Sequence, residues 1–182
     1  DTGDATNEVI FTVLDITERK RAEEALKESR QRFEDIIEFL PDATFVVDRN
    51  KNVIAWNRAM EEMTGVKGED MLGKGAYDYA NPLYGTQRPM LIDLVQTPDN
   101  ELEKNLYTQV SHRGDSVIAE TFIPMLRGRP VYLWGTAKPL YDAAGNIAGI
   151  IESIRDITES RLAEQALRAS ETFLDTVIES SP

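Results

Sequence analysis

The two ends of this chain repeat one another, and this repeat constrains the fold more than any other feature. The segment Asp15-Ile16-Thr17-Glu18 recurs as Asp156-Ile157-Thr158-Glu159, and matches continue without a gap as far as Pro41 and Pro182. We therefore expect one whole repeat unit, preceded by the end of another and followed by the start of a third, as in a piece of a tandem array. A unit used in series predicts a modular function.

The offset of the repeat divides the chain into four expected segments. Residues 1–16 are predicted to be the last strand of a preceding repeat, because 9–16 is rich in β-branched and aromatic side chains. Residues 17–40 are predicted to form a linker helix, residues 41–158 the central domain, and residues 159–182 an outgoing linker helix that leads into the next repeat.

Composition excludes several classes of function. The formal net charge of -12 disfavours nucleic acid and anionic membrane surfaces as partners. The absence of cysteine excludes disulfides, thiolate zinc sites, thiol nucleophiles and covalent attachment of haem. No apolar run approaches the roughly 20 residues of a membrane span. We expect a soluble, cytoplasmic segment without membrane contact, although the parent protein could be anchored elsewhere.

Both predicted linker helices carry a narrow apolar seam. In the first, apolar and small residues recur at alternating spacings of four and three, at Ala22, Leu26, Ser29, Phe33, Ile36 and Leu40. Most positions between them are charged, so the helix would gain from an apolar partner. That partner is either the same helix of a second copy, in a parallel coiled coil centred on Leu26 and Phe33, or the helix's own domain.

The central segment predicts an α+β domain. Strands are expected over 43–48, 53–56, 116–125, 131–141 and 146–157, the first two forming a hairpin and the last three a meander. Between these groups, Asn57 predicts the cap of a short helix over 58–64, with further helical segments near 69–73, 90–95 and 100–110. The expected fold is one curved five-stranded antiparallel sheet with short helices on one face, flanked by long amphipathic helices.

The order of these motifs resembles that of a PAS domain. The run from Pro41 to Ala59, followed by Met63-Thr64-Gly65 and Met71-Leu72-Gly73, is similar to the first half of that family's pattern. Pro139-Leu140-Tyr141-Asp142 and the closing Asp156-Ile157-Thr158-Glu159 resemble its last strands and its exit. The similarity covers about residues 38–160, and the flanks match the linkers that join such domains in sensor histidine kinases. The hairpin turns and the loop 74–89 depart from the family pattern.

The resemblance implies a small-molecule ligand between the sheet and the helices, but names none. The cysteines of light sensors that bind flavin or a cinnamoyl chromophore are absent, so those two activities are excluded. Noncovalent haem or flavin has no support in the sequence. The cofactor is therefore unknown.

Strand alternation combined with the resemblance selects the candidate site. Leu133, Gly135 and Ala137 are expected to face inward, together with Glu152 and Ile154, and the small residues would leave room for a ligand. An inward carboxylate needs a partner. The expected partner of Glu152 is Arg88 or Tyr84 from the loop 74–89, or a cationic or amine-bearing ligand. The competing interpretation is an internal Glu–Arg pair without any ligand. Trp134, on the outer face of the sheet, would contribute to a dimer contact.

No pattern in the chain predicts catalysis. The single histidine, His112, falls in a polar segment that reads as a solvated turn, and no nucleophile–base set or phosphate-binding loop is present. Asp156 and Thr158 are expected to cap the outgoing helix and to couple it to the sheet. We expect a signal-sensing module of a multi-domain protein, a histidine kinase by resemblance, that forms homodimers and contacts neighbouring repeats and a downstream kinase domain. The alternative is a ligand-free dimerisation and spacer module.

Overall fold

The computed structural model describes the backbone of residues 4–179 and the side chains of residues 17–173. Residues 1–3 and 180–182, the outer ends of the segments predicted over 1–16 and 159–182, lie outside the described part. The chain divides into two compact units, Asp1–Phe39 and Leu40–Pro182, and each is described by itself.

The first unit consists of one helix, α1 (Asp4–Glu38). The strand predicted over residues 9–16 is therefore wrong, although the assignment of residues 1–16 to a preceding repeat stays a prediction. A strand must pair its backbone N–H and C=O groups with a neighbour, whereas a helix satisfies them internally. The sheet contains six strands, all from the second unit, and residues 9–16 are not among them. Ion pairs one turn apart, such as Arg19 with Glu23 and Arg30 with Glu34, add support on the exposed surface of α1.

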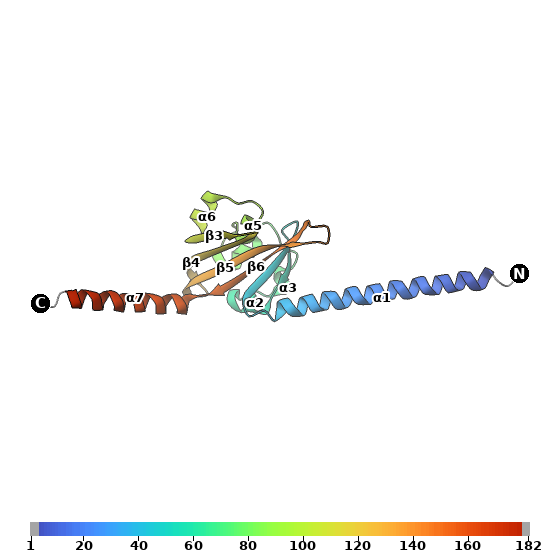
Figure 1. Ribbon diagram of the computed structural model, residues 1–182, viewed down its shortest axis with the longest axis horizontal. Coiled ribbons are helices and arrows are strands. Elements are labelled where there is room, and N and C mark those ends of the chain that lie inside the picture. The colour runs from blue at the N-terminus through green and yellow to red at the C-terminus, as the bar shows by residue number, and fades with distance from the viewer. Residues whose placement is uncertain (1–3, 180–182) are drawn as a thin grey trace. The chain divides into compact units, whose positions relative to one another are not determined.

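The second unit is built on one antiparallel sheet in the order β2-β1-β6-β5-β4-β3 (Figure 1). Its strands are β1 (Ala43–Asp48), β2 (Val53–Trp56), β3 (Gln109–Arg113), β4 (Ser116–Leu126), β5 (Arg129–Tyr141) and β6 (Ile147–Asp156). The α+β fold is confirmed, with six strands instead of the five expected. The additional strand is β3, which lies at the sheet edge and pairs only with β4. Its mostly exposed polar residues lack the apolar alternation of a half-buried strand.

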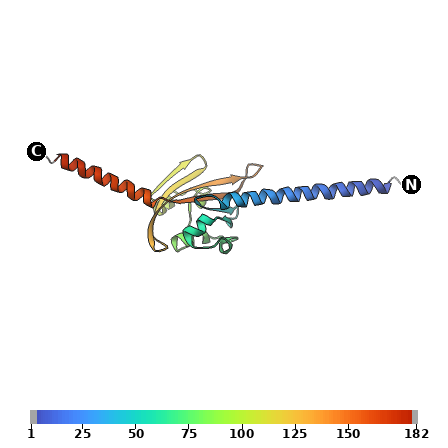
Figure 2. The same ribbon diagram turned by 90° about the horizontal axis from the view of Figure 1, so that it is seen from below.

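Short helices cover one face of this sheet (Figure 2). They are α2 (Arg58–Thr64), α3 (Gly68–Met71), the 3₁₀ helix η1 (Asp78–Ala80), α4 (Asn81–Tyr84), α5 (Leu91–Leu94) and α6 (Asn100–Leu106), and the outgoing helix is α7 (Thr158–Glu179). α5 contacts β4, β5 and β6 and thereby lies over the centre of the sheet. The core between them contains Phe45, Met60, Tyr79, Ile92 and Ile150, all fully buried.

Asn57 joins the start of the domain to its first helix. Its side-chain oxygen accepts the backbone N–H groups of Thr44 and Met60, and its amide nitrogen donates to the carbonyls of Leu40 and Asp42. An asparagine side chain offers two acceptor sites and two donors, so all four are used here. The predicted cap of α2 thus also fixes the chain where it enters β1.

Candidate functional site

Four polar side chains converge in the interior of the domain, on the helix-covered face of the sheet. Glu152 comes from β6, Tyr84 from the end of α4, Arg88 from the loop that follows, and Tyr107 from the segment between α6 and β3. We call these four residues the interior polar cluster. Glu152 is 2% exposed and Tyr107 is 8% exposed, although both carry polar atoms, whereas Tyr84 and Arg88 are half-buried.

Burial makes the carboxyl group of Glu152 a proton donor near neutral pH. Removal from water raises its pKa to about 8, while the backbone N–H of Ile92, 2.9 Å from Oε2, lowers it less strongly. The group is therefore mostly protonated at neutral pH.

The remaining members of the cluster include two polar atoms without partners. The guanidinium carbon of Arg88 lies 3.7 Å from the ring centroid of Tyr84 and 5.8 Å from that of Tyr107. Its Nη2 donates to the carbonyl of Leu106 at 3.5 Å. Within residues 17–173, the Nε of Arg88 and the hydroxyl of Tyr107 are buried, and neither makes a hydrogen bond of normal geometry. Arg88 nevertheless lies close enough to the Tyr107 hydroxyl to oppose the rise in its pKa. Burial raises the pKa of both Tyr84 and Tyr107, so both phenols stay protonated.

The structure places the predicted inward residues on the covered face but fills the space between them. Leu133, Gly135, Ala137 and Ile154 are all buried beside Glu152. The expected room at Gly135 is occupied: a Cβ built there would lie 2.9 Å from Cδ1 of Leu91 in α5. The small residue at this position thus serves the close approach of a helix. Arg88 lies near Glu152 and acts on its pKa, yet no ion pair within 4.0 Å joins these two described side chains.

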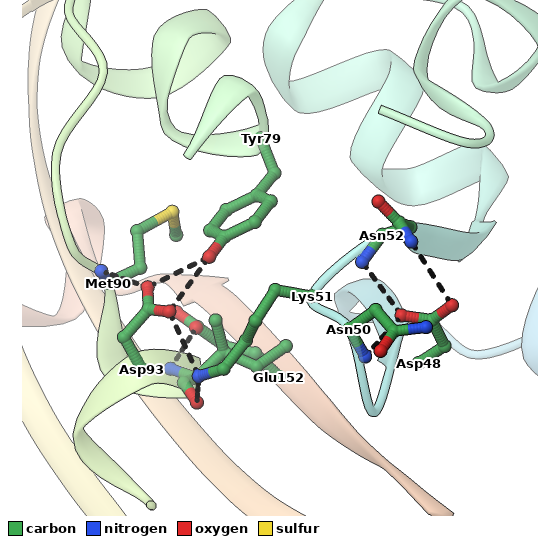
Figure 3. Close-up of polar contacts among 9 residues, drawn as sticks. Asp48, Asn50, Lys51, Asn52, Tyr79, Met90, Asp93 and Glu152 are labelled. Atoms are coloured by element: carbon green, nitrogen blue, oxygen red, sulfur yellow. Dashed lines mark hydrogen bonds and ion pairs between the residues drawn. The ribbon is translucent and has the colours of Figure 1, made fainter. Parts of the chain in front are cut away.

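A second polar centre, which the sequence analysis missed, surrounds Asp93 on α5 (Figure 3). Its carboxylate accepts the hydroxyl of Tyr79 at 2.9 and 3.0 Å, the backbone N–H of Met90 at 2.9 Å and the ammonium of Lys51 at 3.1 Å. Ile92, the preceding residue, bonds Glu152, so α5 connects both centres. The signal in the sequence was one carboxylate within the apolar run Met90–Val95. Tyr107 carried no comparable signal.

The chain passes from β6 into α7 through a group of hydrogen-bonded polar residues. Oδ1 of Asp156 accepts the backbone N–H of Thr158 at 2.9 Å, and Arg129 of β5 donates to Oδ2 at 2.6 Å. Burial alone would raise the pKa of Asp156, but these bonds outweigh it and hold that pKa below its ordinary value. The hydroxyl of Thr158 accepts the N–H of Tyr132, a strand amide, and Arg161 of α7 pairs with Glu120 of β4. The first turn of α7 is thereby bonded to two strands.

The side chains predicted to form a dimer contact lie on two elements, α1 and β5. Leu26 and Phe33 are 71% and 41% exposed on α1. Trp134 is partly exposed on the uncovered face of the sheet, with the guanidinium of Arg155 5.9 Å from its ring. On α7, Leu162, Leu167 and Phe173 are also exposed. The solvated turn expected at His112 is instead part of β3, where Nε2 lies 3.1 Å from Glu103.

The described part of the chain offers neither a cluster of metal ligands nor a helix suited to a membrane crossing. Within the described residues, no group of three or more His, Asp or Glu side chains could hold a metal ion. Among the helices described above, none combines the length and the apolar character that a membrane crossing needs.

Comparison with known proteins identifies the architecture. The family model described as PAS fold matches residues 37–162. The virulence sensor protein BvgS of Bordetella bronchiseptica is 28% identical over 181 residues, which cover 93% of this chain and 14% of that protein. An uncharacterized protein, y4lL, of Sinorhizobium fredii is 27% identical over 154 residues, covering 85% of this chain and 17% of its own length. The chain thus spans about a sixth or less of these curated relatives.

A solved structure shows the same fold at low sequence identity. The structure of an RNA-binding light-oxygen-voltage receptor matches with a TM-score of 0.52 at 17% identity, and the match covers 79% of this chain and 37% of that one.

Proposed function

The chain belongs to the PAS fold family, and from this membership we propose that it is the signal-sensing module of a multi-domain signal transduction protein. The PAS fold is a sensory, non-catalytic fold, so the function to be explained is recognition and relay. The similarity to a virulence sensor protein agrees with this role.

The observation that carries the proposal is the pair of unpartnered polar atoms in the interior polar cluster. A buried donor without a hydrogen bond is costly and rare, and it calls for an explanation such as a missing ligand. The Nε of Arg88, the hydroxyl of Tyr107 and the protonated carboxyl of Glu152 together offer several donors. The ligand class that fits is a small molecule with hydrogen-bond acceptors, namely a carboxylate, a carbonyl or a ring nitrogen. A cationic ligand fits less well, because Arg88 is charged and Glu152 is mostly neutral.

The relay runs along β6 to the exit. Glu152 and Asp156 lie on this one strand, which pairs with β1 on one side and β5 on the other. A ligand that moves Glu152 or α5 would shift β6 against β5. Tyr132 of β5 bonds Thr158 in the first turn of α7, and Arg129 of β5 bonds Asp156 at the end of β6, just before that turn. In our proposal, the state of the cluster changes the packing of α7 with a second copy.

The proposed homodimer rests on the exposed apolar residues of the long helices. Leu26 and Phe33 are exposed seven residues apart on α1, which is the spacing of a coiled-coil seam, and Leu167 is exposed on α7. We propose a homodimer through these helices, with Trp134 on the sheet as an added contact. The parent would be a cytoplasmic or membrane-anchored histidine kinase with neighbouring PAS repeats and a downstream kinase domain.

One observation favours the alternative, a ligand-free dimerisation and spacer module. Leu91 packs against Gly135, so a ligand at the cluster requires this side chain to move. In the spacer interpretation the interior stays packed and only the helices have a function.

Native mass spectrometry of the full chain distinguishes the two functions. Sensing predicts a copurified or added acceptor-bearing small molecule on the folded protein, lost in Tyr107→Phe, which removes only the unpartnered hydroxyl. Lys138→Gln on the exposed face of β5 is the matched control and should retain the molecule. A wild-type protein that binds nothing from its host's metabolite extract contradicts sensing and supports the spacer.

A further inference from the structure

A depression on the surface of the second unit lies beside Asp93, outside the interior polar cluster. Its volume is about 460 Å³, within the range of small-molecule sites. The β1–β2 turn, the loop before η1 and the segment from α5 into α6 surround it. Its lining residues are Asn50, Lys51, Ala76, Tyr77, Tyr79, Pro89, Asp93, Leu94, Gln96, Thr97, Asp99 and Leu102. We call this cavity the outer depression.

The charges that line the outer depression are two carboxylates and one ammonium. Asp99 caps α6 by accepting the N–H groups of Glu101 and Leu102. Asp93, with a side chain only 11% exposed, accepts from Tyr79, Met90 and Lys51. Tyr79 is fully buried and the Met90 donor is backbone, so both are fixed. The ammonium of Lys51 stands at the end of a flexible chain and is the donor that another cation can replace.

The backbone around the outer depression is strained. Lys51, Ala76 and Tyr77 have φ values of 67°, 51° and 67°, in the left-handed region that disfavours side chains with a Cβ. They are three of the four residues other than glycine that adopt this conformation within the described chain, and all three line the same cavity. Strain of this kind concentrates at ligand-binding sites, where the surrounding structure holds it in place.

We propose that the outer depression binds a small organic ammonium ion, a primary amine on a compact apolar or aromatic body. The amine takes the place of the Lys51 ammonium at Asp93, and Lys51 turns into solvent. The body of the ligand lies against Tyr77, Pro89 and Leu94, which belong to the apolar part of the lining. The chain's net charge of -12 favours the approach of a cation.

This site goes beyond the proposed function, because it takes a ligand of opposite character at a different place. The interior polar cluster offers donors to an acceptor, whereas the outer depression offers a carboxylate to a donor. The two are connected through α5, where Ile92 bonds Glu152 and its neighbour Asp93 faces the outer depression. An amine at Asp93 therefore acts on the segment that also covers the interior.

The test uses benzylamine, which is cationic at neutral pH, and benzyl alcohol, its uncharged analogue, with the full chain followed by amide chemical shifts in NMR. We expect benzylamine to shift the amides of Tyr77, Gln96 and Thr97 and to bind at least about tenfold more tightly than the alcohol. Lys51→Asn removes the competing cation and suits the left-handed backbone. It should strengthen benzylamine binding several-fold, whereas Asp93→Asn should reduce it to the level of the alcohol.

Several results would overturn the proposal. These are equal binding of the two compounds, shifts confined to other regions, or weaker benzylamine binding by Lys51→Asn. If Asp93→Asn does not fold, the Lys51→Asn result decides alone. Tyr107→Phe should bind benzylamine like the wild type, so failure of the sensing proposal and failure of this one are distinguishable.

Discussion

Two buried tyrosines offer a paired test of the interior polar cluster, because the same substitution should have opposite effects at the two positions. The hydroxyl of Tyr107 is buried without a partner among the described residues, whereas that of Tyr79 lies 2.9 and 3.0 Å from the carboxylate oxygens of Asp93. Tyr→Phe removes one hydroxyl in each case and preserves the ring. All differences in stability then report on how each hydroxyl is bonded.

The magnitudes follow from these contacts. A buried polar group without a hydrogen bond costs about 1–3 kcal/mol, and Tyr107→Phe removes this cost. The small void left by the lost hydroxyl offsets part of the gain, so the substitution should raise the free energy of unfolding by about 1 kcal/mol. A hydrogen bond to a charged group contributes about 1.5–3 kcal/mol, so Tyr79→Phe should lower it by about 2 kcal/mol. The expected gap between the variants is about 3 kcal/mol.

Urea unfolding of ligand-free protein, followed by tryptophan fluorescence, measures this gap. The protein should first be unfolded, dialysed and refolded, since a bound acceptor would satisfy Tyr107 and reverse the sign of its effect. The slope of the transition should be the same in all three proteins if only stability changes. A loss of stability in Tyr107→Phe as large as that in Tyr79→Phe would refute the reasoning, because the hydroxyl would then have a partner inside the protein.

Three other predictions concern the carboxyl group, the exit and the helix seam. Because the pKa of Glu152 is raised from its ordinary 4.5 to about 8, the folded state holds a proton that the unfolded state releases, and wild-type stability should fall relative to Glu152→Gln as pH rises through this window. Urea unfolding at several pH values checks this, and a constant difference would contradict it. Asp156→Ala should cost about 1 kcal/mol and lower the melting temperature by about 2–4 °C, leaving ligand affinity nearly unchanged while uncoupling output in the full-length parent; normal signal-dependent output would reduce Asp156 to a structural cap. Leu26→Glu with Phe33→Glu should convert a dimer to a monomer in light scattering, whereas Gln31→Glu, outside the seam, should not; a wild-type monomer at high concentration would end this interpretation.

The parts of the fold that the sequence predicted are those with strong local signals. β1, β2 and α2 have the expected bounds, because turn residues separate the strands and Asn57 begins the helix. β3 was missed, since an exposed edge strand needs no apolar alternation. The strand expected over 9–16 failed for the opposite reason: its composition suits a strand, but strand formation depends on neighbours that local composition does not report.

The candidate site was predictable only where strand periodicity applies. The alternation of β5 and β6 places Glu152 beside Gly135 and Ala137, as the sequence suggested. The contact of Asp93 with the Met90 N–H has the three-residue spacing of a helix N-terminus. Lys51 and Tyr79 reach Asp93 from distant segments, and no spacing rule connects them to it. The contact of Leu91 with Gly135 was equally unpredictable. A glycine that allows a helix to approach the sheet cannot be distinguished in sequence from one that leaves space for a ligand.

The four bonds of Asn57 have a consequence for how this position can vary. Aspartate has the same shape but would turn acceptor oxygens toward the carbonyls of Leu40 and Asp42, and glutamine would carry the amide one bond too far. Serine and threonine, which cap helices elsewhere, reach only one side of the junction. No other amino acid reproduces the set, so a scan of all substitutions should find this buried asparagine among the least replaceable residues of the domain, although it touches neither ligand site.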